Sequence, residues 1–165
     1  MNRRSFWLLP LCVVFALSTT NRVAAQSEIV LEVTSEEKGA LSKVASYRLA
    51  DLLQMPARTI KTKTVWTEGE QEFVGVSLDH LLRLFKIETG VLQAFALNDY
   101  MVEIPVEEVS EEGAIIAYER NGKVMSLREK GPLWIIYPYD DDPKFRREEI
   151  YARSIWQLNR IQLVP

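Results

Sequence analysis

The chain has 165 residues, 47% of them hydrophobic, which suffices for one domain with a hydrophobic core. It carries 20 basic and 23 acidic residues, a net charge of −3, and no stripe of Lys and Arg. This balance argues against nucleic acids and anionic membrane surfaces as partners.

The first 25 residues have the pattern of a secretory signal peptide. Arg3 and Arg4 give a positive start, residues 6–17 form an apolar run, and small residues lead up to Ala25. The run is short for a membrane span, so we expect cleavage after Ala25, a periplasmic or secreted protein, and no stable membrane insertion afterwards. An uncleaved anchor is the alternative. The paired arginines also fit a loose twin-arginine signal, which exports folded proteins.

The expected mature part, residues 26–165, is predicted to be a single domain. The signal contains three Arg and no acidic residue, which leaves 17 basic and 23 acidic residues, a net charge of −6. The only cysteine, Cys12, lies in the signal. The mature part therefore has no disulfide, cysteine nucleophile or thiolate metal ligand.

Most of the domain has strand patterns, in which apolar and β-branched residues alternate or cluster between turn residues. Asn121-Gly122 predicts a hairpin turn of the primed type. The expected strands cover 28–34, 58–67, 71–74, 91–97, 101–104, 114–119, 123–127, 131–138 and 155–164.

One segment has the apolar spacing of a full helix, capped by Ser77 and ending before Gly90. Its apolar residues are Leu78, Leu81, Leu82 and Phe85. Shorter helical segments are expected at 47–55, 106–109 and 145–152, and a loop at 35–45. The sequence thus predicts a strand-dominated α+β domain with a mixed sheet and one main helix.

The central stretch is expected to be the strand between Gly131 and Pro138. Five large apolar or aromatic residues follow Pro132 without a charge, which suits a short strand buried on both faces. The acidic turn Asp140–Asp142 comes directly after it. A buried strand that opens into such a loop is where we expect a site.

Few residues are candidates for catalysis or metal binding. His80 is the only histidine and has no ligand partner at i+4, so a partly exposed helix residue is favoured over a metal ligand. Asp140–Asp142 lacks the alternation of a calcium loop, so a solvated acidic turn is favoured. No catalytic or metal-ligating residue is predicted.

An ordered set of short motifs runs through residues 58–164. They are Phe73-x-Gly75-Val76-x-Leu78, Asn98-Asp99-Tyr100 with Ile104-Pro105, Asn121-Gly122, Gly131-Pro132-Leu133 with Pro138, and Trp156 with Ile161. In this order they resemble the molybdopterin-binding oxidoreductase domain of the sulfite oxidase family. The resemblance implies a mixed α+β fold, a molybdenum cofactor, and transfer of an oxygen atom or electrons.

The chain departs from the family pattern where the cofactor would bind. The family's metal-ligating cysteine corresponds to Thr62, or to Thr64, and a neutral hydroxyl is a poor ligand for molybdenum. Asp140–Asp142 stands where the family holds the pterin phosphate, and carboxylates repel phosphate. Lys144, Arg146 and Arg147 offset part of this repulsion. We therefore expect a relative without cofactor.

Aromatic and polar residues predict a ligand pocket at the position of the family's cofactor site. Trp134 and Trp156 are expected to be core residues instead. The expected pocket residues are Thr62, Trp66, Asn98, Asp99, Tyr100, Tyr137, Tyr139 and Arg153.

Three functions follow from this sequence. The first is an exported, cofactor-free binding module for a small molecule or for a periplasmic or membrane signalling protein. The second is a molybdenum-dependent oxidoreductase with a non-thiolate metal site. The third is a structural subunit of an envelope complex.

Overall fold

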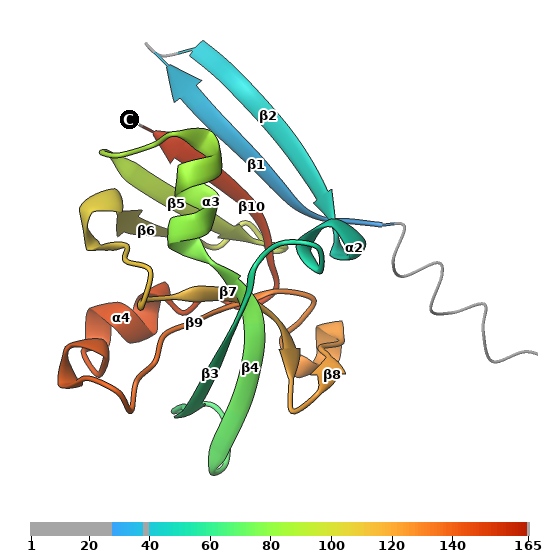
Figure 1. Ribbon diagram of the computed structural model, residues 1–165, viewed down its shortest axis with the longest axis vertical. Helices are drawn as coiled ribbons and strands as arrows, with labels where there is room; N and C mark the ends of the chain where they lie inside the picture. Colours follow the sequence, from blue (N-terminus) through green and yellow to red (C-terminus); the bar gives the residue numbers. More distant parts are fainter. Residues whose placement is uncertain (1–27, 38–39, 165) are drawn as a thin grey trace, which may run out of the picture.

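The computed structural model describes residues 28–37 and 40–164, so the expected signal peptide and its cleavage site lie outside the described residues. In this part of the chain, ten strands form two sheets, and every helix is short (Figure 1). The buried apolar side chains of both sheets belong to one hydrophobic core. The fold is α+β and dominated by strands.

The first sheet has the order β2-β1-β10-β5-β6. Its first and last strands along the chain, β1 and β10, pair in parallel, and the other pairs are antiparallel, so the sheet is mixed. The strands are β1 (Ile29–Glu37), β2 (Ala40–Arg48), β5 (Val91–Ala96), β6 (Met101–Pro105) and β10 (Leu158–Val164).

The second sheet has the order β3-β4-β7-β8, and β9 pairs with the first half of β7. All its pairs are antiparallel. The turn between β7 and β8 has φ of 52° at Asn121 and 72° at Gly122, which confirms the primed hairpin turn. The strands are β3 (Ala57–Lys63), β4 (Glu70–Ser77), β7 (Ile115–Arg120), β8 (Lys123–Val124) and β9 (Trp134–Ile136).

The central strand β9 joins the two sheets. All three of its residues are fully buried, which confirms the expected strand with two buried faces. One edge of β9 pairs with β7, and on the other edge the Ile135 N–H donates to the Ile155 carbonyl at 2.9 Å. Leu158, at the start of β10, donates to the Leu133 carbonyl at 3.0 Å. The strand is short because Pro132 and Pro138 flank it and offer no N–H.

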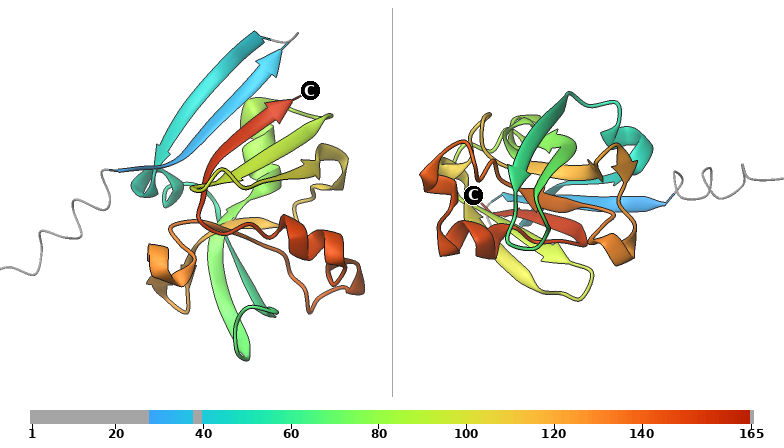
Figure 2. Two further views of the ribbon diagram at one scale, coloured as in Figure 1. Left: turned by 180° about the vertical axis from the view of Figure 1, so that it is seen from behind. Right: turned by 90° about the horizontal axis from the view of Figure 1, so that it is seen from below.

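The main helix is α3, Leu78–Phe85, and it lies against one face of the first sheet (Figures 1 and 2). Ser77 occupies its N-cap position as expected, although its buried hydroxyl has no hydrogen-bond partner among the described residues. Two short α-helices and three 3-10 turns complete the described chain. They are α2 (Leu49–Leu52), α4 (Glu148–Arg153), η1 (Val106–Glu108), η2 (Leu127–Glu129) and η3 (Pro143–Phe145).

Two expectations near the start of the domain are wrong. The segment 35–45, predicted as a loop, forms the end of β1 and most of β2, and the predicted helix 47–55 shortens to α2. Polar residues in β2 suggested a loop, yet β2 is an edge strand in which side chains such as Lys43 and Ser46 are exposed, and polar residues suit such a strand.

No helix in the described ranges is long and apolar enough to span a bilayer.

Candidate functional site

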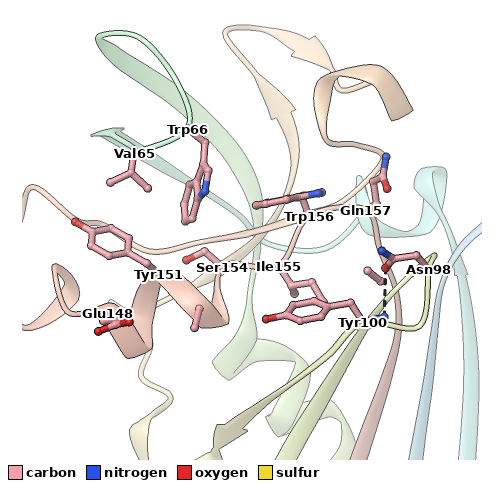
Figure 3. Close-up of a pocket in the computed structure, with 12 residues that line it drawn as sticks. Val65, Trp66, Asn98, Tyr100, Glu148, Tyr151, Ser154, Ile155, Trp156 and Gln157 are labelled. Atoms are coloured by element: carbon pink, nitrogen blue, oxygen red, sulfur yellow. Dashed lines mark hydrogen bonds between the residues drawn. The ribbon is translucent and has the colours of Figure 1, made fainter.

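A cavity of about 530 Å³ opens where the two sheets meet (Figure 3). We call it the aromatic cavity. Four segments meet there: the β3–β4 loop, the β5–β6 turn, helix α4 and, directly after α4, the stretch before β10. The lining residues are Val65, Trp66, Ala96, Asn98, Tyr100, Glu148, Tyr151, Ala152, Ser154, Ile155, Trp156 and Gln157.

Trp66 is the centre of an aromatic cluster at this cavity. Its ring centroid lies 6.0 Å from that of Tyr151 and 5.9 Å from that of Trp156, both in edge-to-face geometry. Behind it, Trp134 and Tyr139 lie at 5.8 and 6.4 Å. Edge-to-face pairs of this kind stabilise beyond the area they bury. The half-buried Trp66 is therefore held between a buried layer and the open cavity.

A buried hydrogen-bond network supports the floor of the cavity. The Ser154 hydroxyl donates to the Ile150 carbonyl at 2.8 Å and lies 2.5 Å from the Tyr139 hydroxyl. The Trp134 indole N–H donates to the Ser154 carbonyl at 3.1 Å. Because Ser154 donates its only hydroxyl hydrogen to Ile150, it accepts from the Tyr139 hydroxyl, and burial raises the pKa of Tyr139 well above its ordinary value.

The polar groups at the aromatic cavity are neutral or negative. Asn98 accepts a hydrogen bond from the Tyr100 N–H at 3.2 Å, which shapes the β5–β6 turn, and Gln157 donates to the Leu127 carbonyl at 3.0 Å. Glu148 lies exposed at the margin, below Tyr151 in Figure 3. None of the described residues that line the cavity is Lys, Arg or His.

Four of the expected pocket residues belong to this site. Trp66, Asn98 and Tyr100 line the aromatic cavity, and Tyr139 packs behind Trp66. Asp99 does not line it; its carboxylate lies 3.4 Å from Arg160 instead.

Tyr137 and Arg153 lie at a different, smaller cavity of about 300 Å³. The Arg153 guanidinium donates to the Glu108 carboxylate at 2.6 Å. This hydrogen bond lowers the pKa of Glu108. Tyr137 is buried beside this pair, and burial raises its pKa.

Thr62, the expected counterpart of the metal-ligating cysteine, is fully buried and lines neither cavity. Its hydroxyl accepts a hydrogen bond from the Asp140 N–H at 3.2 Å and lies 3.3 Å from the Lys63 carbonyl. In return, the Lys63 N–H donates to the Asp140 carboxylate at 2.8 Å. The Thr62 hydroxyl is thus occupied by the backbone of the acidic turn, and its surroundings do not fit a molybdenum ligand.

The acidic turn is explained by local hydrogen bonds. Asp140 binds the end of β3, and Asp142 accepts from the Lys144 N–H at 2.8 Å, which caps η3. Asp140 and Asp141 are exposed. In the described part of the chain, no group of three His, Cys, Asp or Glu side chains could hold a metal ion.

The prediction that Trp156 is a core residue is wrong, because its side chain is 38% exposed and lines the aromatic cavity. Trp134 is fully buried as expected. Tyr151 and Glu148 were not in the predicted site. Their spacing of three residues places both on one face of a helix, and this signal could have identified them together.

No protein-family model matches this chain, and no curated protein matches it. The resemblance to the sulfite oxidase family therefore rests on the residues quoted above and stays a prediction.

Proposed function

We propose that this domain is a binding module that holds a small organic ligand in the aromatic cavity. In line with the sequence, we propose an exported protein that works without a molybdenum cofactor, as a ligand sensor or as a partner of a signalling protein. The observation that carries the proposal is the cavity itself, with rings from four segments around an open volume of about 530 Å³. Small-molecule sites are commonly preformed apolar hollows with a few polar groups.

The support of the cavity strengthens this proposal. Trp66 is fixed by its neighbouring rings, and Ser154 is fixed by its bonds to Ile150 and Tyr139. A rigid cavity loses little conformational entropy when a ligand enters, which favours binding.

The oxidoreductase alternative lacks support at the residues that would carry it. Thr62 is buried and hydrogen-bonded to the acidic turn, and the described residues that line the aromatic cavity include no basic side chain that could bind a phosphate. Molybdenum and pterin content of protein purified from a host that makes the cofactor tests this point. We expect neither in stoichiometric amount, and near-stoichiometric molybdenum would favour the oxidoreductase.

Binding can be tested by fluorescence because three of the four tryptophans, Trp66, Trp134 and Trp156, form one cluster at the cavity. Suitable probes share a tert-butyl-shaped head and differ in charge: choline, 3,3-dimethylbutan-1-ol and 3,3-dimethylbutanoate. We expect at least one of these probes to quench the tryptophan fluorescence, or to shift its emission maximum, in a saturable way. This response should be lost in Trp66→Leu. If none of the three binds up to 50 mM, the proposed function is wrong.

A structural subunit is the second candidate, and the edge strand β2 favours it. This nine-residue strand pairs only with β1 among the described strands, and Val44 is exposed. An unpaired edge can add a strand from another chain. Light scattering after size exclusion tests this candidate: discrete oligomers that Val44→Lys disrupts would support it, and a monomer at high concentration would argue against self-assembly.

A further inference from the structure

We propose that the ligand of the aromatic cavity is a small organic cation, a protonated or quaternary amine. This inference rests on the proposed function and specifies its ligand class.

The rings provide the attractive surface. Trp66, Tyr100, Tyr151 and Trp156 approach the hollow from four segments, so a ligand in it meets aromatic carbon on several sides (Figure 3). The face of an aromatic ring is negative, and Trp and Tyr attract a cation placed over it within about 6 Å. A neutral apolar ligand gains only burial there, whereas a cation gains burial and this electrostatic attraction.

The charge at the margin has the matching sign. Glu148 lines the cavity, is exposed, and forms no ion pair with any basic side chain of the described residues. Its neighbour Glu149 differs, because Arg147 lies 3.6 Å from it. With no Lys, Arg or His among the described lining residues, Glu148 is the one charged residue among those that line the cavity. The domain as a whole is also acidic.

The protein itself places a cation on this cluster. The Lys130 ammonium lies 3.9 Å from the ring centroid of Trp156 and 5.6 Å from that of Trp134, outside the lining of the cavity. The cluster thus already holds one ammonium group. Because Lys130 uses the attraction of Trp156, the ligand should depend more on Trp66, Tyr100 and Tyr151.

Choline and 3,3-dimethylbutan-1-ol give the direct comparison, since they differ in a single atom, nitrogen in place of carbon, and hence in charge. We expect choline to bind about tenfold more tightly than the alcohol, and 3,3-dimethylbutanoate to bind most weakly. Titrations at constant ionic strength, followed by tryptophan fluorescence, measure these ratios. Equal or tighter binding of the alcohol would refute the proposal that the ligand is a cation but would still support a binding module. If no probe binds, both the cation and the binding module are refuted.

Two substitutions test which side chains cause the preference for choline over the alcohol. Tyr100 is 54% exposed, so Tyr100→Leu should fold, and it should lower the choline-to-alcohol ratio by about threefold or more. Glu148→Gln should weaken choline about threefold and leave the alcohol unchanged. Glu88→Gln removes the same charge from an exposed position outside the cavity and should change neither. If Glu148→Gln and Glu88→Gln act alike, the carboxylate of Glu148 has no role in the site.

Discussion

The hydrogen bond between Tyr139 and Ser154 gives a quantitative test of how the cavity floor is held. Both side chains are buried, and the Ser154 hydroxyl also donates to the Ile150 carbonyl. Ser154→Ala therefore leaves the Tyr139 hydroxyl buried without a partner, which costs about 2–3 kcal/mol of unfolding free energy. Tyr139→Phe removes the hydroxyl but leaves Ser154 bonded to Ile150, so it should cost only about 1 kcal/mol.

The double variant separates the interaction from its surroundings. Once Tyr139 is Phe, Ser154→Ala loses only the bond to Ile150 and should cost about 1 kcal/mol. The double-mutant cycle should then give a coupling energy of about 1–2 kcal/mol, the difference between the cost of Ser154→Ala with and without the Tyr139 hydroxyl. Urea unfolding, followed by tryptophan fluorescence, measures each free energy. Independent sites add within about 0.5 kcal/mol, so additivity at that level would refute the supporting network.

Three further predictions follow from single residues. Gly75→Ala should lower the free energy of unfolding by about 3 kcal/mol, because a Cβ there would lie 2.6 Å from the Cα of Ala117 in the neighbouring strand; a Tm within 2 °C of wild type would contradict this. Burial raises the pKa of Tyr137 in the folded state, so above pH 10 the unfolded state loses the tyrosine proton while the folded state keeps it. The free energy of unfolding should therefore fall by up to about 1.4 kcal/mol per pH unit above pH 10. In Tyr137→Phe this decline should be shallower. The hydrogen bond from Arg153 lowers the pKa of the half-exposed Glu108, so the pair stabilises the folded state above the ordinary Glu pKa, and this contribution is lost as the pH falls below it. In urea unfolding, Glu108→Gln should therefore lower the free energy of unfolding by about 0.5 kcal/mol at pH 7 and leave it unchanged at pH 3.

Local patterns in the sequence predicted much of the fold. The helix after Ser77, the turn at Asn121-Gly122 and the buried strand before Pro138 each depend on neighbouring residues, and the structure contains all three. The hairpin of β1 and β2 was missed because its polar side chains indicate solvent exposure, and both loops and solvent-exposed sheet faces have this property.

The site was only partly predictable because it depends on contacts between distant segments. Trp66 and Tyr100 were expected from their aromatic character, and both line the cavity. Trp156 was assigned to the core because tryptophan side chains are usually buried. Its partial exposure depends instead on where the β3–β4 loop and α4 lie relative to it. Tyr137 lies close to Tyr139 in sequence but beside a different cavity, and nothing local distinguishes the two.

The most direct test of the central claim is nuclear magnetic resonance of the indole N–H groups during a titration with choline. Trp66 and Trp156 line the aromatic cavity, whereas Trp134 is fully buried and its indole N–H donates to the Ser154 carbonyl. If a ligand enters the cavity, the Trp66 and Trp156 resonances should shift together and saturate at one dissociation constant, with a much smaller change for Trp134. Shifts that are absent, or that fall only on residues outside the cavity lining, would contradict the binding site.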